Sequence, residues 1–144
     1  MKINIREADV QDAEAISILN TIALGYYYPI EDTERKLVSV LNSSKEKVFV
    51  AVAENVVVGY IHANDYDVLY YPALKNIMGI AVAEEYRRCG IGKELLGAVE
   101  AWAKETGAKG IRFVSGAGRK EAHAFYRNCG FGSEKDQINF KKMF

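Results

Sequence analysis

The spacing of hydrophobic and polar residues predicts that the chain begins with one strand and two helices. Ile3 and Ile5 alternate with polar residues, a pattern typical of a strand with one buried face. Asp9 to Asp12 offers a helix start, and Pro29 follows three tyrosines that break the helix. A second helix is expected from about Asp32 to Leu41. The apolar positions of the first helix, which recur at helical spacing, are Ala13, Ile16, Leu19, Ile22 and Ala23.

Three strands are expected in the middle of the chain. Val48 to Ala53 is an apolar run, and Glu54 with Asn55 forms a tight turn. Val56 to about Asp67 is rich in β-branched and aromatic residues and returns as the next strand, and Ile77 to Ala83 is the third. The short turn favours an antiparallel meander.

The apolar period then changes to that of a long helix, which begins at Ile91 and ends at Gly107. Its apolar face comprises Ile91, Leu95, Leu96, Ala98, Val99, Trp102 and Ala103. A strand at Ile111 to Ser115, a short helix at Lys120 to Asn128 and a last strand at Ile138 to Met143 complete the prediction.

The predicted order is β-α-α-β-β-β-α-β-α-β, with an extra strand near Phe131 left open. This order indicates an α/β fold in which a mixed sheet with an antiparallel meander is flanked by helices. A chain of 144 residues can bury roughly two-thirds of its unfolded surface. We therefore expect residues 1–144 to form a single domain.

Composition indicates a globular protein, with 49% hydrophobic and 26% charged residues. The longest apolar run, Val48 to Ala53, is far below the roughly 20 residues of a membrane-spanning helix. The N-terminus lacks the apolar core of a signal peptide, and Cys89 and Cys129 make no disulfide framework. A reduced cytoplasm fits best. With His62 and His123 as the only histidines, there is no Cys/His cluster with metal-ligand spacing, so no metal is expected.

The net charge is zero, but the charge is unevenly distributed along the sequence. Residues 1–83 hold 7 basic and 11 acidic residues, whereas residues 84–144 hold 12 and 8. A nucleic-acid partner would call for a broadly basic protein, so none is expected. The split is consistent with scattered surface charge, or with an anion held by the C-terminal half.

The segment most informative about function runs from Ile80 to Lys93. A predicted strand enters a loop with two glycines, and a long helix follows. Glycines let the backbone turn sharply and approach a ligand, and N–H groups at a helix start favour a phosphate. Arg87, Arg88 and Lys93 add positive charge. The alternative is an ordinary strand-to-helix turn.

Two common phosphate-binding motifs do not match this loop. In the P-loop, Arg87 would occupy the first glycine position, and Glu94 replaces the Ser or Thr that should follow Lys93. The dinucleotide-binding fingerprint fails at its third glycine, where this chain has Leu95.

The pattern Arg87-x-x-Gly90-x-Gly92, between a strand and an amphipathic helix, resembles the signature of the GCN5-related N-acetyltransferase (GNAT) superfamily. The opening Ile5 to Ala8, with Asp12 nearby, is also similar to the start of that family.

A second stretch, residues 119–131, resembles the second cofactor motif of the family, a helix with Ala and Tyr126 that closes with Gly130 and Phe131. The similarity covers nearly the whole chain, in the family's order. It implies an N-acetyltransferase that moves the acetyl group of acetyl-CoA to a primary amine. Direct transfer in a ternary complex is expected because neither cysteine is placed to carry the acetyl group.

The resemblance also assigns residues to acetyl-CoA. Main-chain groups of a strand would pair with the pantetheine arm, and the loop that follows would hold the pyrophosphate. Arg119 stands where relatives often have Asn, and either reaches the CoA phosphates or is exposed to solvent. The residues so assigned are Ile80, Ala81, Val82, Arg87, Arg88, Cys89, Gly90, Ile91, Gly92, Lys93 and Arg119.

Tyr126 occupies the position of the family's general acid, which protonates the departing thiolate. Its alternative role is that of a half-buried aromatic residue. Cys89 lies in the predicted phosphate loop and Cys129 at a helix end, so neither is expected to carry the acetyl group covalently.

The general base is left open. Asn76 and Val114 stand about where two better-known branches of the family have their catalytic glutamates, so neither of those activities is carried over. The candidates are His62, Asp65, Glu84, His123 or a water chain.

The expected acceptor is a primary amine of a small cationic molecule, and its identity is left open. Tyr26 to Glu34 combines aromatic and acidic residues, which suits a cationic acceptor such as a polyamine, an aminoglycoside or a peptide amine. The same segment would equally form a polar helix cap with the tyrosines packed beneath that cap. The alternatives are a protein or peptide amine acetyltransferase and a silent CoA-binding regulatory module. The acyl chain and a homodimer stay open, and no membrane partner is expected.

Overall fold

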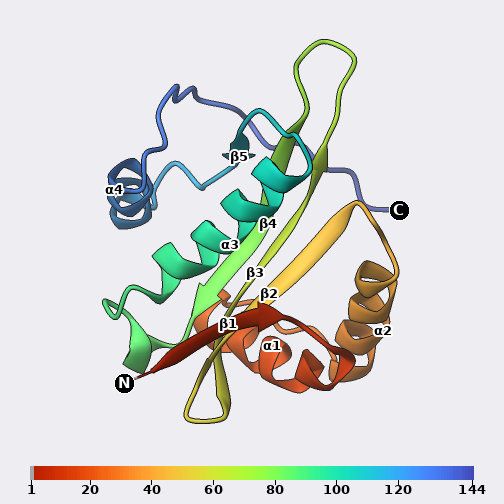
Figure 1. Cartoon of the computed structure of the whole chain (residues 1–144). Coiled ribbons are helices and arrows are strands. Elements are labelled where there is room, and N and C mark those ends of the chain that lie inside the picture. Colours follow the sequence, from red (N-terminus) through yellow and green to blue (C-terminus); the bar gives the residue numbers. More distant parts are fainter. Residues whose placement is uncertain (1) are drawn as a thin grey trace. The chain divides into compact units, whose positions relative to one another are not determined.

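The computed structural model describes residues 2–144, whose regular elements are one sheet and a set of helices (Figure 1). The strands are β1 (Ile3–Glu7), β2 (Glu46–Ala53), β3 (Val56–Tyr66), β4 (Leu74–Val82) and β5 (Ile111–Phe113). The helices are α1 (Ala13–Leu19), α2 (Ile30–Leu41), α3 (Ile91–Glu105) and α4 (Lys120–Asn128). Two single-turn 3₁₀ helices (Val10–Asp12 and Glu84–Tyr86) and a π-helical turn (Asn20–Leu24) complete the list.

The chain forms two compact units, of which the first ends at Phe113 and the second comprises Val114–Phe144. The first unit contains the whole sheet with α1, α2 and α3, and the second contains α4. Among residues 2–144, no helix is both long enough and apolar enough to span a membrane.

The five strands lie in the order β1-β2-β3-β4-β5. The first four pair antiparallel and form the predicted meander, while β5 runs parallel to β4. The β4–β5 pairing is short, since only Lys75–Ile77 of β4 face Ile111–Phe113. The predicted mixed α/β class is therefore confirmed, and its one parallel pair follows the long helix, as a crossover connection requires.

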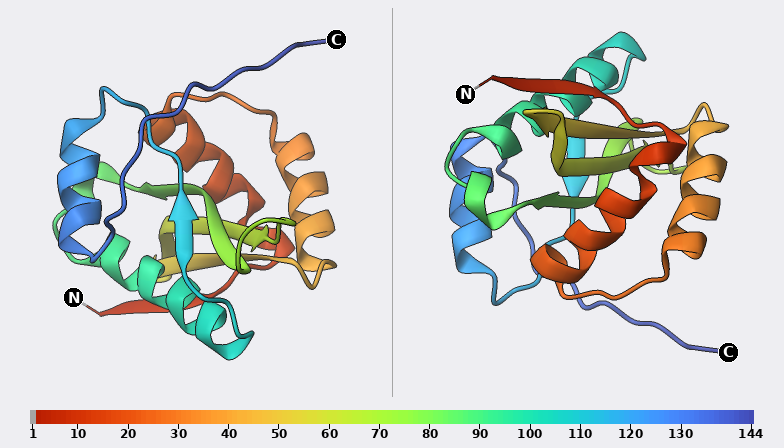
Figure 2. Two further views of the ribbon diagram at one scale, coloured as in Figure 1. Left: turned by 90° about the horizontal axis from the view of Figure 1, so that it is seen from above. Right: turned by 90° about the horizontal axis from the view of Figure 1, so that it is seen from below.

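In the first unit, helices lie on both faces of the sheet (Figure 2), and successive residues of β3 face opposite sides. A Cβ on Gly59 would lie 3.3 Å from Ile91 and 3.4 Å from Leu95, so this glycine lets α3 pack closely on one face. Tyr60, the next residue, joins a buried cluster with Ile16 of α1 and other residues of α1 and α2 on the other face. The core therefore has α3 on one side of the sheet and α1 with α2 on the other.

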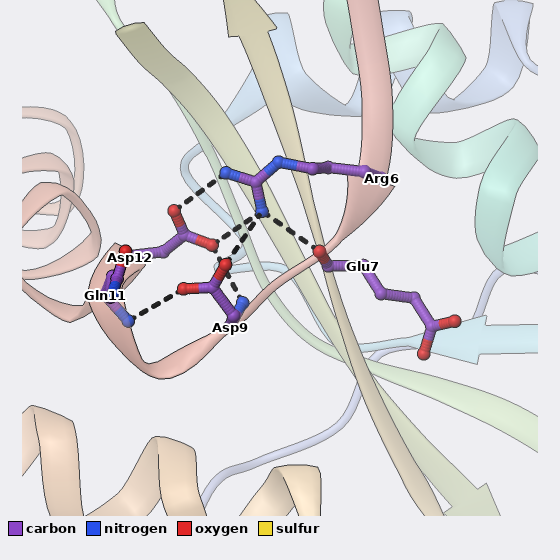
Figure 3. A network of polar contacts seen from close by, with 5 residues as sticks. All are labelled: Arg6, Glu7, Asp9, Gln11 and Asp12. Atoms are coloured by element: carbon purple, nitrogen blue, oxygen red, sulfur yellow. Dashed lines mark hydrogen bonds and ion pairs between the residues drawn. The ribbon is translucent and has the colours of Figure 1, made fainter. Parts of the chain in front are cut away.

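A charged network joins the end of β1 to the start of α1 (Figure 3). The guanidinium of Arg6 donates to both oxygens of Asp12, at 2.8 and 2.9 Å, and Asp12 also accepts from the main-chain N–H of Asp9. Asp9 in turn accepts from the N–H of Gln11, so a capping box starts the helical region. Burial alone would raise the pKa of Asp12, but these hydrogen bonds and the Arg6 charge lower it below its ordinary value.

The predicted first helix is shorter than expected. Helix α1 ends at Leu19, and Asn20–Leu24 continues as a π-helical turn that Gly25 closes with a φ of 75°. A π-helical turn inserts one extra residue per turn, and the apolar spacing of the sequence does not distinguish it from an α-helix.

The prediction of a last strand at Ile138 to Met143 is wrong for this structure, and the extra strand left open near Phe131 is not formed. Within residues 2–144, no strand follows β5. Ile138, Phe140 and Met143 are 79%, 86% and 81% exposed. Alternation of apolar and polar residues is insufficient for a strand when no neighbouring strand pairs with it.

Candidate functional site

The outer edge of β4 is open beyond its first few residues. β4 pairs with β3 as far as Val82, but on the other side β5 ends at Phe113, opposite Ile77. The main-chain groups of residues 78–82 that point away from β3 therefore have no strand partner in the described chain. Ile80, Ala81 and Val82, which the sequence analysis assigned to pantetheine, lie in this stretch, as a ligand that adds like a strand requires.

A β-bulge lies at the point where this edge opens. His62 of β3 faces Gly79 and the next residue, Ala63, faces Ile77, so Met78 is the extra residue on β4. Met78 is 57% exposed. Bulges bend a strand and re-aim its side chains, and they are frequent next to active sites.

The loop between β4 and α3 leads into a helix start whose first main-chain N–H groups lack a helical acceptor. The 3₁₀ turn is closed by hydrogen bonds from Tyr86 N to Ala83 O (3.0 Å) and from Arg87 N to Glu84 O (3.1 Å). Arg88 and Gly90 then adopt left-handed backbone conformations, with φ of 65° and 79°. The first bond back from the helix is Glu94 N to Gly90 O (3.0 Å), so the preceding N–H groups of α3 have no intrahelical acceptor.

Three cations flank these N–H groups in the sequence. Arg87, Arg88 and Lys93 are exposed, and none of them forms an ion pair within residues 2–144. Glu94 is an exposed carboxylate in the first helical turn. The free N–H groups, the positive end of the helix dipole and three unpaired cations form a site suited to a phosphate or pyrophosphate.

Cys89 is exposed in the middle of this loop, between the two residues with positive φ. Gly92 lies in the first turn of α3 and Ile91 is buried beneath it. The structure therefore brings the whole predicted loop together with Ile80–Val82 in the first unit.

Tyr126 and Arg119 lie in the second unit, on and just before α4. Tyr126 is buried between the rings of Phe125 and Phe131, with centroids at 5.3 and 6.0 Å. Burial raises the pKa of its phenol, and the nearby positive charge of Arg119 opposes the rise only in part. The phenol is therefore protonated at neutral pH and has a proton to donate.

A cavity of about 260 Å³ opens on the face of the sheet that carries α1 and α2. Its walls are mostly apolar, with a few convergent polar groups, as is typical of small-molecule sites. The lining residues are Ile16, Asn20, Tyr28, Thr33, Lys36, Leu37, Val40, Val48, Tyr60 and His62.

The predicted acceptor segment contributes only in part to this cavity. Tyr28 lines it, with the Lys36 ammonium 4.8 Å from the centre of its ring. The carboxylates do not line it: Glu31 and Glu34 are exposed on α2, and Asp32 pairs with Arg35.

Sequence reasoning missed Tyr60, which bonds to the Asn20 side chain across the cavity and whose pKa is raised by burial. The sequence does contain a pattern that could have indicated this residue. Tyr60, His62 and Asn64 have polar groups and stand at alternate positions of one strand, so their side chains share a face of the sheet.

Three of the candidate general bases lie in different parts of the first unit. His62 lines the cavity and bonds to Glu46 at 2.9 Å. Asp65 is held by Lys75, whose ammonium lies 3.8 Å from the centre of the Trp102 ring on the α3 side of the sheet. Glu84 is exposed in the 3₁₀ turn.

Of the other positions considered in the sequence, His123 and Asn76 are held by hydrogen bonds, and Val114 is exposed. His123 bonds to the carbonyl of Gly116 within the second unit, at 2.9 Å. Asn76 is fixed between Asn64 and Arg112, at 3.1 and 2.7 Å. Among residues 2–144, no group of three His, Cys, Asp or Glu side chains is arranged to hold a metal ion.

Comparison with known proteins agrees with this geometry. Residues 14–131 match the model of the Acetyltransferase (GNAT) family. Aminoglycoside N(6')-acetyltransferase type 1 of Stenotrophomonas maltophilia is 28% identical over 142 residues, which cover 95% of this chain and 91% of that protein. The protein of the same name from Acinetobacter genomosp. 13 is 41% identical over 66 residues, 44% of each chain.

Solved structures share the fold over nearly the whole chain. AAC(6')-Iy in complex with the bisubstrate analogue CoA-S-monomethyl-acetylneamine has a TM-score of 0.88 at 19% identity, and the match covers 100% of both chains. A transcriptional regulator from Bacillus halodurans C-125 has a TM-score of 0.89 at 23% identity, over 98% of this chain and 100% of that one.

The chain therefore belongs to the Acetyltransferase (GNAT) family. It is an N-acetyltransferase, and acetyl-CoA is its co-substrate. The open edge of β4 and the cationic loop after it form the candidate site for this co-substrate.

Proposed function

We propose that this protein transfers the acetyl group of acetyl-CoA directly to a primary amine of a small cationic molecule, in a ternary complex. The observation that carries the proposal is the continuity of the open β4 edge with the N–H-rich, cationic loop at the start of α3. The names of the relatives, which are aminoglycoside N-acetyltransferases, support a polycationic acceptor of that class.

The binding roles follow from the two halves of this surface. Main-chain groups of Ile80, Ala81 and Val82 pair with the amides of the pantetheine arm, and the loop from Arg87 to Lys93 holds the pyrophosphate. Arg119 supplies a further cation to the phosphates. Bound acetyl-CoA presents its acetyl group as a thioester, which a neutral amine attacks.

Tyr126 is proposed as the general acid that protonates the departing thiolate. Its phenol keeps its proton at neutral pH because burial raises its pKa. A positioned acid of this kind contributes roughly 10²–10⁴-fold to the rate.

Direct transfer, without an acetyl-cysteine, is proposed because of where the two thiols lie. Cys89 is in the loop assigned to the pyrophosphate, at the opposite end of the pantetheine arm from the thioester. Cys129 caps the end of α4, where its N–H bonds to main-chain carbonyls of the helix. The position of Cys89 therefore keeps its thiol at the pyrophosphate end of the cofactor, and Cys129 has the position of a helix-end packing residue.

The acceptor is proposed to enter the cavity lined by Tyr28, Tyr60 and His62. This cavity lies on the face of β3 where His62 is opposite the bulge of β4, and its aromatic walls suit the apolar faces of an amino sugar. Cation–π contact with exposed Tyr26 and Tyr27 adds attraction for a polycation outside the cavity.

The experiment is a panel of amines mixed with protein and acetyl-CoA, with CoA release measured by a thiol reagent and the products by mass spectrometry. The panel contains aminoglycosides, polyamines and peptides with free N-termini or lysines. Acetylated aminoglycoside supports the proposal, and an acetylated peptide with unmodified aminoglycosides contradicts its acceptor class. If acetyl-CoA binds but no amine is acetylated, the protein is a CoA-binding module.

A further inference from the structure

A hydrogen-bonded His–Glu pair stands at the wall of the acceptor cavity. The Nε2 atom of His62 on β3 lies 2.9 Å from Oε1 of Glu46 on β2. The two side chains are 26% and 30% exposed, so the pair is neither buried in the core nor fully solvated. His62 lines the cavity. A titratable ring therefore faces the space proposed for the acceptor.

The sheet register places this histidine opposite the point where β4 opens. His62 faces Gly79, the residue that follows the Met78 bulge and precedes the stretch assigned to pantetheine. Gly79 has no side chain, and a Cβ there would lie 3.7 Å from the Tyr60 hydroxyl. The face of the sheet between His62 and the β4 edge is thus free of a side chain at that position.

The pairing with Glu46 determines which ring nitrogen is free. A carboxylate only accepts hydrogen bonds, so Nε2 of His62 is the donor and the neutral ring has its lone pair on Nδ1. This is the arrangement in which a carboxylate orients a histidine that acts as a proton acceptor.

We propose that His62 is the general base that deprotonates the acceptor ammonium, and that Glu46 is the residue that positions it. The inference rests on the proposed function and names the base that it leaves open. The other groups that line the cavity and titrate are Lys36, Tyr28 and Tyr60. An ammonium group has no lone pair for a proton, and a phenol is a far weaker base than an imidazole, so His62 is the best proton acceptor among the residues that line the cavity.

The proton balance is complete without another reactant. The ammonium nitrogen gives one proton to Nδ1 of His62, which releases it to solvent. The nitrogen then forms the C–N bond as the C–S bond breaks. It loses its second proton to water, while the sulfur gains one from Tyr126, which water reprotonates. One acetyl group is transferred, and one proton is released overall.

The test compares His62→Gln and His62→Ala with the wild type across pH, at saturating acetyl-CoA and with the best acceptor of the panel. We expect kcat/KM for the acceptor to fall by about 10²-fold. We also expect the fall in rate on the acid side, which reports protonation of the base, to disappear from the profile. Imidazole added to His62→Ala should restore part of the rate.

A second pair of variants tests the role of Glu46. Glu46→Gln keeps an oxygen that accepts from Nε2–H, so it should retain most of the activity and the acid limb. Glu46→Ala removes the acceptor, so the rate should fall while KM for acetyl-CoA stays unchanged. A merely structural role predicts equal losses in both variants and no change in the pH profile.

His123→Ala is the matched control, because it removes the other histidine. The His123→Ala variant should still show the fall in rate on the acid side of the pH profile. The acetyl-CoA-induced rise in melting temperature, which needs neither His62 nor Glu46, verifies that each variant is folded. A folded His62→Ala or His62→Gln with the wild-type rate and acid limb would overturn the inference. If the wild type acetylates no amine, the proposed function fails instead.

Discussion

Replacing Gly90 with Val should weaken acetyl-CoA binding through the backbone alone. Gly90 precedes α3 with a φ of 79°, and nothing lies within 4 Å of where its Cβ would be. The substitution therefore creates no clash with a neighbour, but a β-branched residue is an outlier at that φ. The loop must then leave its conformation, and the N–H groups that follow Gly90 turn away from the phosphate.

The magnitude follows from two separate costs. Forcing a non-glycine residue into the left-handed region costs about 1–3 kcal/mol, or roughly 4–12 °C in melting temperature for a chain of this size. Each hydrogen bond to a charged group that is lost contributes about 1.5–3 kcal/mol, so loss of even one weakens binding by about tenfold or more. Calorimetric titration with acetyl-CoA gives the affinity, and thermal unfolding gives the stability.

Gly107→Val provides a matched control at the other end of the same helix. Gly107 also has a φ of 79° and nothing within 4 Å of its Cβ position. It should show a comparable loss of stability but wild-type affinity for acetyl-CoA. Equal affinities of the two variants would refute the assignment of the α3 N-terminus to the pyrophosphate.

Three further predictions test other parts of the account. Tyr126→Phe removes only a hydroxyl, so kcat should fall by about 10²-fold or more with little change in acetyl-CoA affinity, and near-normal turnover would remove Tyr126 from the mechanism. Cys89→Ala and Cys129→Ala should retain most of the activity. Double-reciprocal plots of the initial rate against the two substrates should intersect, as a ternary complex requires, and an acetyl-cysteine trapped in the wild type would contradict direct transfer. Arg6→Ala leaves the buried Asp12 carboxylate without its ion-pair partner. The free energy of unfolding, measured with urea at pH 7, should fall by about 2 kcal/mol. Because the folded pKa of Asp12 is lowered, this stabilisation is present above pH about 4 and is lost as the pH falls through the folded pKa. The difference between wild type and variant should therefore shrink in acid, and a difference independent of pH would count against the ion pair.

The sequence predicted the first unit well because its signals are local. The meander follows from strand patterns joined by short connections, and the loop with Gly90 needs a positive φ that glycine supplies. The strands β2 and β3 and the helix α3 begin and end within a few residues of their predicted limits, and so does α4 in the second unit.

Features that depend on how one strand pairs with another could not be predicted from the sequence. The alternating segment at residues 138–143 reads as a strand, yet no partner strand is formed with it. The β4 bulge depends on the register with β3, and the His62–Glu46 pair on the register between β2 and β3. Neither leaves a signal in the spacing along one strand. That residues 1–144 form one domain, and that Tyr126 and Arg119 serve the active site, stay predictions.

The most direct test of the central claim is a single reaction of purified protein, acetyl-CoA and an aminoglycoside, followed by mass spectrometry of all three. The account predicts an aminoglycoside that gains one acetyl group, released CoA in equal amount and an unmodified protein. Released CoA with an acetylated protein and an unchanged aminoglycoside would contradict direct transfer to a small amine, and so would bound acetyl-CoA with no acetylated product.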